Sequence, residues 1–395
     1  MTILVVPRDT VGKAPRLSLF YAAAFLVVGV QLPFWPVFLA GRGLDAREIA
    51  SVFAAAIWAK VVVGPAIGAL ADRLGARRGV MIGLAALSVV FYAALWPAAG
   101  FTAILLLNLV AGVAQSALMP LGDSITLAAV RREGLDYGRV RVWGSVTFIL
   151  AAVGSGALLP IIAAGSEAGG DNRVLLLVLA AAAVLAAACV GMPASEPAAG
   201  PRRGRWAALG RLATDRDFWL FVVSAAALQA SHQLYYGFGT LYWRDLGFSE
   251  MVIGVLWAEG VVAEIVLFWY SAPLVARFGP LGLMALGGAA GILRWSLMGV
   301  SPGLGAAAAL QLLHALTFGA SHLGAMHFMA RRVPLGAAAS AQSLYSALSA
   351  GFGSGLVMLA AGALYAAYGG QAYPFMALLS GAGLCGVLWL RRTSR

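Results

Sequence analysis

Long apolar stretches separated by short polar ones run the length of the chain. Each apolar stretch has about 20 residues or more, which is the length that an α-helix needs to cross a bilayer. The pattern predicts twelve transmembrane helices, at residues 17–40, 49–71, 79–98, 102–130, 139–163, 174–192, 218–243, 251–276, 280–300, 303–330, 337–366 and 372–390. The predicted fold is therefore an all-α membrane protein with two six-helix bundles.

The two sets of six helices carry matching motifs. Residues 43–50 match residues 247–254, and residues 70–75 match residues 274–279, each at an offset of 204 positions. Such a repeat is typical of transporters built from two related halves, so we expect two pseudo-symmetric bundles. The expected organisation is a cytoplasmic N-terminus at 1–16, an N-terminal bundle at 17–192, a Pro-, Ala-, Gly- and Arg-rich linker at 193–216, a C-terminal bundle at 217–390 and a cytoplasmic tail at 391–395.

Capping residues and glycine pairs predict helix ends and helix contacts. Asp45 and Ser249 stand just before the second helix of each half, where a short polar side chain caps the first turn, and Glu48 completes a capping box with Asp45. Glycines four residues apart predict close packing of helices. These pairs are Gly64 with Gly68, Gly287 with Gly291, and Gly351 with Gly355.

Composition and charge agree with a membrane location. The chain is 61% hydrophobic and 11% charged, and its mean hydropathy is +0.88, which is far outside the range of soluble domains. Its net charge is +11, yet 20 of the 27 Lys and Arg residues lie in the termini and in alternate loops. By the positive-inside rule both termini are expected in the cytoplasm. The excess of Lys and Arg is thus explained by the orientation of the chain in the membrane, and we expect no nucleic-acid partner.

One stretch, residues 119–144, places a carboxylate and a guanidinium at the facing ends of two apolar segments. Asp123 and Arg141 are expected to form two halves of a substrate site, because an ionised side chain in hydrocarbon costs roughly 2.5 to 3.5 kcal/mol unless it is paired or hydrated. A polar stripe on the fourth helix points to a water-filled cavity, or alternatively to hydrogen bonds between helices. Its members are Asn108, Gly112, Gln115, Met119 and Asp123.

Other ionisable groups lie within apolar segments. Lys60 is expected either to bind a substrate carboxylate or to form a standing ion pair with Asp123 or Glu264. Glu259 and Glu264 are five residues apart on one predicted helix, about 140° around it, so they cannot face the same cavity. Glu264 is the candidate proton carrier, although either carboxylate could instead pair with Arg294.

Histidines add groups that titrate near neutral pH. His232 lies on a polar face of the seventh helix with Gln229, Gln233 and Tyr236, and His314 lies on the tenth helix. Each histidine is either part of proton coupling or a hydrogen-bonded scaffold residue. The spacing of the histidines on the tenth helix does not suit a metal site, so no metal is expected.

The loop at residues 68–78 resembles the signature loop between the second and third helices of the major facilitator superfamily. The resemblance implies that its charged residues form a cytoplasmic latch that alternating access must break, with plain topogenic charge as the other interpretation. These residues are Asp72, Arg73, Arg77 and Arg78. In the second half Ala276 replaces the acid, so the equivalent latch is expected to be weaker or absent.

Residues 120–141 also resemble the oligosaccharide and proton symporters, the lactose permease group, whose acidic and substrate-binding residues fall on Asp123 and Arg141. Phe148 stands where that group has a stacking Trp, which favours an apolar or aromatic substrate. Gln311 and Thr317 depart from the lactose permease pattern, whereas Arg294 and His314 match it. Together with Lys60, these differences make the chain more similar to the 3-phenylpropionate permease branch.

The expected function is secondary active transport: proton-coupled uptake of a small organic acid, with phenylpropionate-like aromatic acids favoured, by alternating access. The expected substrate-binding residues are Asp123, Arg141, Lys60, Gln115, Asn108, Phe148, Gln31, His232, Tyr236 and His314. The expected proton-coupling residues are Asp123, Glu264, Arg294 and His314.

Other functions remain open at this stage. The alternatives are a sugar or nucleoside symporter, a drug exporter and, more remotely, a membrane sensor or intramembrane enzyme. No nucleotide-binding loop of the Gly-x-x-x-x-Gly-Lys type occurs, so we expect the proton gradient as the driving force and no cofactor. No recognisable set of nucleophile and base, or of metal ligands, converges at one depth, so we expect no enzyme activity. The expected partners are the substrate, protons and lipid. We expect a monomer in a bacterial-type cytoplasmic (inner) membrane.

Overall fold

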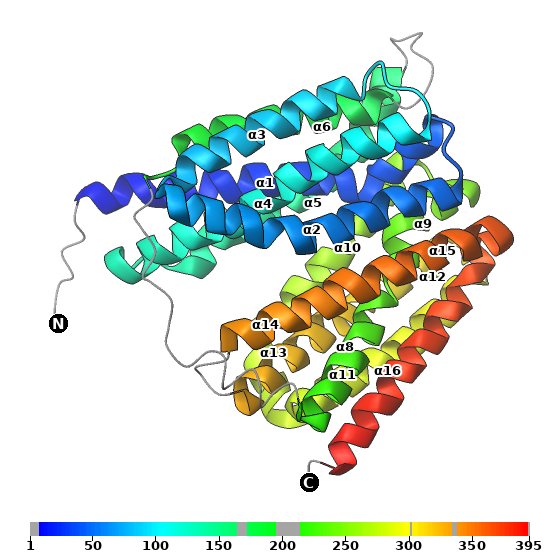
Figure 1. Cartoon of the computed structure of the whole chain (residues 1–395). Helices are drawn as coiled ribbons and strands as arrows, with labels where there is room; N and C mark the ends of the chain where they lie inside the picture. Colours follow the sequence, from blue (N-terminus) through cyan, green and yellow to red (C-terminus); the bar gives the residue numbers. More distant parts are fainter. Residues whose placement is uncertain (1–7, 164–171, 195–213, 301, 334–337, 394–395) are drawn as a thin grey trace. The chain divides into compact units, whose positions relative to one another are not determined.

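The computed structural model describes residues 8–163, 172–194, 214–300, 302–333 and 338–393, and helices dominate these residues (Figure 1). Most of the predicted linker, the first seven residues of the predicted N-terminus and the last two of the tail lie outside them. Contacts group the described residues into two compact units. Unit 1 contains those between 8 and 44 and between 59 and 194, and unit 2 contains those between 45 and 58 and from 214 onward. The sequence repeat instead assigns residues 45–58 to the first half. The contact units therefore do not follow the predicted bundles, whose boundaries remain a prediction.

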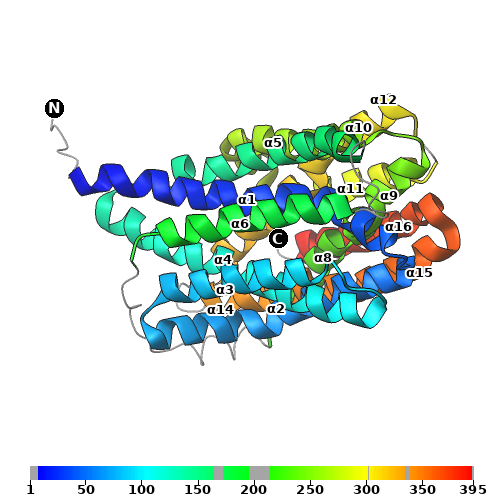
Figure 2. The same ribbon diagram turned by 90° about the horizontal axis from the view of Figure 1, so that it is seen from above.

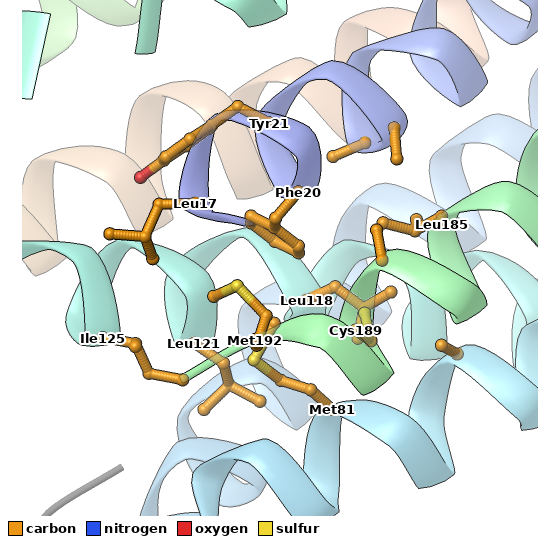
Figure 3. Close-up of a cluster of buried hydrophobic side chains, with 14 of the residues drawn as sticks. Leu17, Phe20, Tyr21, Met81, Leu118, Leu121, Ile125, Leu185, Cys189 and Met192 are labelled. Carbon is orange, nitrogen blue, oxygen red and sulfur yellow. The ribbon is translucent and has the colours of Figure 1, made fainter. Parts of the chain in front are cut away.

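Unit 1 is built on a long first helix. Its helices are α1 (Arg8–Gly41), α2 (Ala46–Leu74, in part), α3 (Arg77–Ala94), α4 (Phe101–Glu133), α5 (Tyr137–Ala163) and α6 (Asn172–Gly191). α1 packs against α5 and α6, and α3 packs against α4 and α6 (Figure 2). Buried side chains such as Phe20, Met81, Leu118 and Cys189 form the core between α1, α3, α4 and α6 (Figure 3).

Unit 2 holds the remaining helices. These are α8 (Arg216–Ala230), α9 (Gln233–Asp245), α10 (Glu250–Trp269), α11 (Ser271–Met298), α12 (Leu304–Leu312), η1 (Ala315–Ala320), α13 (Ser321–Arg332), α14 (Ala338–Ser346), η3 (Ala347–Gly353), α15 (Ser354–Tyr368), η4 (Gly369–Ala372) and α16 (Tyr373–Thr393). α11 packs against α13 and α16, and α8 packs against α16. Phe218, Phe221 and Phe328 lie in the core of this unit.

The predicted membrane spans are present. Among the described residues, ten stretches are long and apolar enough to cross a bilayer. Nine of them carry one predicted helix each, and the tenth, Ala341–Thr393, has 53 residues and is long enough to cross twice. The remaining predicted helix, 218–243, is divided into α8 and α9, each too short to qualify alone. The all-helical class is therefore confirmed, and eleven of the twelve predicted spans fall on stretches that qualify.

The repeat also appears in the backbone. Gly43 and Gly247 end the first helix of each half with φ of 80° and 84°, and Gly75 and Gly279 follow with φ of 61° and 66°. Only glycine adopts such angles readily. The two halves thus turn at equivalent positions with the same positive φ, although Gly75 follows the end of α2 whereas Gly279 lies at a bend inside α11.

The predicted helix caps are confirmed. Oδ1 of Asp45 accepts a hydrogen bond of 2.8 Å from the backbone N–H of Glu48, and the Glu48 carboxylate accepts one of 3.0 Å from the N–H of Asp45. The hydroxyl of Ser249 caps α10 by accepting from the N–H of Val252. These side chains satisfy N–H groups that have no partner inside the helix.

Two helix boundaries differ from the prediction. α8 and α9 are separated at Ser231 and His232, whose side chains bond backbone carbonyls of the preceding turn and so compete with the helical hydrogen bonds. The predicted helix at 251–276 ends at Trp269, and α11 then bends at Gly279. Pro280 follows that bend and cannot donate a backbone hydrogen bond.

Two of the three predicted glycine pairs have different surroundings. A Cβ at Gly287 would overlap the hydroxyl of Ser321, and one at Gly291 would lie 2.6 Å from Oγ of Ser380, so close packing is confirmed there. At Gly64 and Gly68 a Cβ would meet no described atom within 4 Å. The packing role predicted for Gly64 and Gly68 is wrong, because both glycines border a cavity between α2 and α4.

Candidate functional site

Asp123 of α4 is held by two tyrosines. Tyr21 of α1 donates a hydrogen bond of 2.5 Å to Oδ1 of Asp123, and Tyr137 of α5 donates a longer one of 3.3 Å to the same atom. α1 approaches α4 closely because Gly122 has no side chain, and a Cβ there would overlap the ring of Phe20. Figure 3 shows Phe20 and Tyr21 pointing to different sides of α1, with the Tyr21 hydroxyl directed away from the core.

Arg141 of α5 lies beside the same tyrosine. Its guanidinium carbon lies 4.2 Å from the ring centroid of Phe25 and 5.3 Å from that of Tyr21, within range of cation–π attraction. Gly144 leaves room for this stack, since a Cβ there would lie 2.8 Å from Nη1 of Arg141. The structure thus brings Asp123 and Arg141 together around Tyr21. The described residues contain no direct ion pair between them within 4.0 Å.

A second polar cluster in unit 1 forms a closed ring. Gln31 donates to the Tyr92 hydroxyl (2.6 Å), Tyr92 donates to Oε1 of Gln115 (2.7 Å), and Gln115 donates back to Oε1 of Gln31 (3.2 Å). Beside it, Trp35 donates to Oδ1 of Asn108 at 2.9 Å. The polar stripe on α4 therefore makes hydrogen bonds between helices at Asn108 and Gln115, which is the alternative interpretation of that stripe.

Lys60 and Phe148 lie apart from these clusters. Lys60 lines the cavity between α2 and α4 and makes no hydrogen bond or ion pair with a described residue. The described residues contain no ion pair between Lys60 and Asp123 within 4.0 Å, so the expected standing pair of these two residues is not formed in this structure. Phe148 is 4% exposed and packs where α5 meets α1, so its ring is not open to a ligand in this structure.

The signature loop is paired within itself. Nε and Nη2 of Arg77 donate to Oδ1 of Asp72 at 2.9 and 2.6 Å. Arg78 donates to the backbone carbonyl of Val190 at the end of α6, and Arg73 is exposed. The loop therefore ties α2, α3 and α6 together, and its role as a latch stays a prediction.

Unit 2 encloses a guanidinium completely. Arg294 of α11 has no exposed surface. Nη1 of Arg294 donates to Nδ1 of His314 and to Oγ1 of Thr317, both at 3.1 Å, and Nη2 donates to Oε1 of Gln311 at 2.5 Å. All three acceptors are uncharged, and Nε has no partner among the described residues. Such a charge is tolerated because its donors are met by well-placed acceptors.

The hydrogen bonds around Arg294 fix both histidine tautomers. Nδ1 of His314 accepts from Arg294, so the ring proton of a neutral His314 is on Nε2, which lies 4.0 Å from the carboxylate of Glu264. In His232, Nδ1 faces two backbone carbonyls and must donate, so Nε2 accepts from the Thr317 hydroxyl at 3.1 Å. A second proton on His314 would set its Nδ1–H against a guanidinium N–H. The structure thus favours neutral His314.

Glu259 and Glu264 face different surroundings, as predicted from their angular separation. Glu264 approaches His314, whereas Glu259 lines an apolar groove of about 810 Å³ between α10, α11, α12 and η1. Near the Glu264 cluster, the ring of Tyr236 stacks on that of His232 at a centroid distance of 5.8 Å. The expected residues of unit 2 therefore share one neighbourhood, and Glu259 lies outside it.

A profile of the MFS_1 like family matches residues 15–377. The chain belongs to this family. Among its relatives, this MFS_1 like protein is 31% identical to the probable 3-phenylpropionic acid transporter of Escherichia coli (strain K12), over 92% of this chain and 94% of the relative. It is 26% identical to the maltose permease of Geobacillus stearothermophilus, over 97% of each chain.

The same fold occurs in a solved transporter. The crystal structure of the nucleoside transporter NupG superposes with a TM-score of 0.82 over 96% of this chain and 98% of NupG, at 18% identity. The resemblance to the major facilitator superfamily and to the 3-phenylpropionate branch is therefore confirmed. The protein is a membrane transporter, and its homologues are not enzymes.

Several partners in this MFS_1 like protein were missed in the sequence. Tyr21, Tyr92 and Tyr235 supply hydroxyls that bond Asp123, Gln115 and Gln311. Gln311 and Thr317 were noted only as departures from the lactose permease pattern, yet both accept from Arg294. The sequence did offer a signal, because Gln311 and Thr317 each put an uncharged hydrogen-bond acceptor within about one turn of His314 on the same predicted helix.

Proposed function

We propose that this protein couples proton entry to the uptake of a small organic acid by alternating access. In this proposal it works as a monomer, without a cofactor, in the cytoplasmic membrane of a bacterium, with both termini in the cytoplasm. The observation that carries the proposal is the titratable cluster in unit 2, where a carboxylate lies beside a neutral histidine that is bonded to a fully enclosed guanidinium. Ionisable residues within membrane spans commonly mark ion or substrate pathways.

Glu264 is the proton acceptor in this cluster. His314 already accepts from Arg294, so a proton that arrives is better placed on the Glu264 carboxylate than on His314. Protonation removes the negative charge of Glu264 and weakens its attraction to Nε2–H of His314. Release of the proton restores that attraction. Asp123 is the second carboxylate of the proposal and is linked to Arg141 through Tyr21.

The proposed substrate is an aromatic or otherwise apolar acid. The relative that is 31% identical is named a probable 3-phenylpropionic acid transporter, and unit 1 offers the rings of Tyr21, Phe25 and Tyr137 around Arg141 and Asp123. A sugar is the second candidate because the maltose permease relative covers the chain almost completely.

Transport by purified protein in liposomes tests the proposal. Labelled 3-phenylpropionate should accumulate when the outside is made acidic, and a protonophore should abolish accumulation. Unlabelled 3-phenylpropionate should compete, whereas maltose and uridine should not. Uptake that ignores the pH gradient would contradict coupling, and competition by maltose alone would favour the sugar.

A matched pair of variants tests the carboxylate. Glu264→Gln should lose accumulation driven by the pH gradient while retaining exchange of labelled for unlabelled substrate. Glu259→Gln, five residues away on the same helix but in the apolar groove, should retain both. Equal losses in the two variants would contradict the assignment of Glu264.

A further inference from the structure

Unit 1 contains a cavity that the Asp123 cluster does not explain. It has a volume of about 310 Å³ and lies between α2 and α4. From α2 it is lined by Lys60, Gly64, Ile67, Gly68 and Asp72, and from α4 by Ser116, Ala117, Pro120, Leu121 and Ser124, with Arg77 at the end near Asp72. This volume is at the lower end of the range for small-molecule sites, roughly 300–1,000 Å³.

Lys60 is the unpaired charge of this cavity. It is the midpoint of α2, a 29-residue helix, and its side chain is exposed to the cavity without a hydrogen bond or ion pair to a described residue. At the other end Asp72 and Arg77 neutralise each other through two hydrogen bonds. The ionisable groups of the lining therefore sum to one net positive charge.

The rest of the wall is apolar or small. Ile67, Ala117, Pro120 and Leu121 offer hydrocarbon. Gly64 and Gly68 leave the space beside α2 open, since a Cβ at either would meet no described atom within 4 Å. One cation at one end of a small apolar cavity fits a monoanion with an apolar body. It suits a sugar less well, because the hydroxyls of Ser116 and Ser124 already donate to backbone carbonyls of their own helix and the apolar part of the wall offers a sugar hydroxyl no partner.

We propose that this cavity binds the carboxylate of the substrate and that Lys60 holds it, so that Lys60 sets the requirement for an acid. The inference rests on the proposed function for the identity of the substrate. It assigns Lys60 a place separate from Asp123, which is bonded to α1 and α5 instead. The ammonium binds the anion by a charge-assisted hydrogen bond, and the glycines of α2 make room for the apolar body.

The lysine content of the chain allows a direct binding assay. Lys13 and Lys60 are the only lysines, and Lys13 is occupied by an ion pair of 2.6 Å with Glu133, so it serves as an internal control. Purified protein is acetylated with an amine-reactive ester, and the rate at each lysine is followed by mass spectrometry. 3-Phenylpropionate should slow the reaction of Lys60 and leave that of Lys13 unchanged. Its primary amide, 3-phenylpropanamide, should protect neither lysine.

Uptake by variants gives the second readout. Wild-type protein should prefer the acid over the amide by at least about tenfold in KM, the loss expected when a charge-assisted hydrogen bond is removed. Lys60→Gln should bring the two KM values together by weakening the acid alone. Gly64→Val should narrow the cavity and reduce uptake, whereas Gly83→Val, at an equally open glycine on α3, should not.

The outcomes separate this inference from the proposed function. The inference would be overturned if the protein takes up the acid, 3-phenylpropionate does not slow acetylation of Lys60 or Lys60 does not react at all, and Lys60→Gln keeps the preference for the acid over the amide. The proposed function would then remain intact. Protection of Lys60 by the acid without any proton-driven uptake would support the site and contradict the function. Uptake that falls in Gly83→Val as far as in Gly64→Val would also overturn the cavity assignment.

Discussion

Replacing Thr317 with valine should expose how the enclosed guanidinium is stabilised. The Thr317 hydroxyl accepts from Nη1 of Arg294 and donates to Nε2 of His232, each at 3.1 Å, and the residue is 2% exposed. Valine has nearly the same shape but no hydroxyl. Thr317→Val therefore removes an acceptor from a charged donor and a donor from a buried ring nitrogen without opening a cavity.

The magnitude follows from these two losses. A buried polar group left without its partner costs about 1–3 kcal/mol, and more where the group is charged. Two such groups predict a loss of about 2–6 kcal/mol. Thr240→Val is the matched control, because Thr240 is 1% exposed and accepts one neutral hydrogen bond of 3.0 Å from Trp257. That variant should lose about 1–3 kcal/mol.

Thermal unfolding of purified protein in detergent provides the assay. Both variants should unfold below the wild-type temperature, and the shift for Thr317→Val should be roughly twice that for Thr240→Val. Because membrane proteins commonly unfold irreversibly, the three proteins are compared at one scan rate. Equal shifts, or a smaller shift in Thr317→Val, would show that Arg294 does not depend on this hydroxyl.

Three further predictions concern packing, capping and transport. Gly287→Ala should destabilise the protein by about 1–3 kcal/mol through overpacking against Ser321, which thermal unfolding measures. An unchanged unfolding temperature would mean that α11 and α13 move apart at no cost and would contradict the prediction. Asp45→Ala should cost about 1 kcal/mol by removing a helix cap, a shift that Asp45→Asn should largely restore. Asp123→Ala and Arg141→Ala should each abolish uptake while leaving the amount of protein in the membrane unchanged, and normal uptake kinetics in both would remove them from the site.

The sequence was sufficient to predict the spans and the repeat because both signals are local. Each span carries its own run of apolar residues, and the equivalent turns need glycine at Gly43 and Gly247 whatever surrounds them. Helix ends were less predictable. The break at His232 depends on side chains that bond the preceding turn. The π-helical turn η1 follows His314, and no residue pattern in the sequence distinguishes it from an ordinary α-helix.

The candidate site was predicted in part. Ionisable residues in apolar helices stand out, so Asp123, Arg141 and Arg294 could be selected from the sequence alone. Their partners could not, because Tyr21 lies 102 positions from Asp123 and nothing in a tyrosine within an apolar helix says which residue it bonds. The direction in which Lys60 points is likewise a tertiary property, which required the positions of α2 and α4.

The surroundings of Arg294 have a consequence for how the chain enters the membrane. Its three hydrogen-bond acceptors, Gln311, His314 and Thr317, all come from the next span, 17 to 23 residues later. When α11 leaves the ribosome, none of them has yet emerged, and a lone guanidinium in lipid carries a substantial free-energy penalty. We therefore expect α11 to wait beside the insertion machinery until α12 and η1 arrive, so that the two spans pass into the bilayer as one helical hairpin.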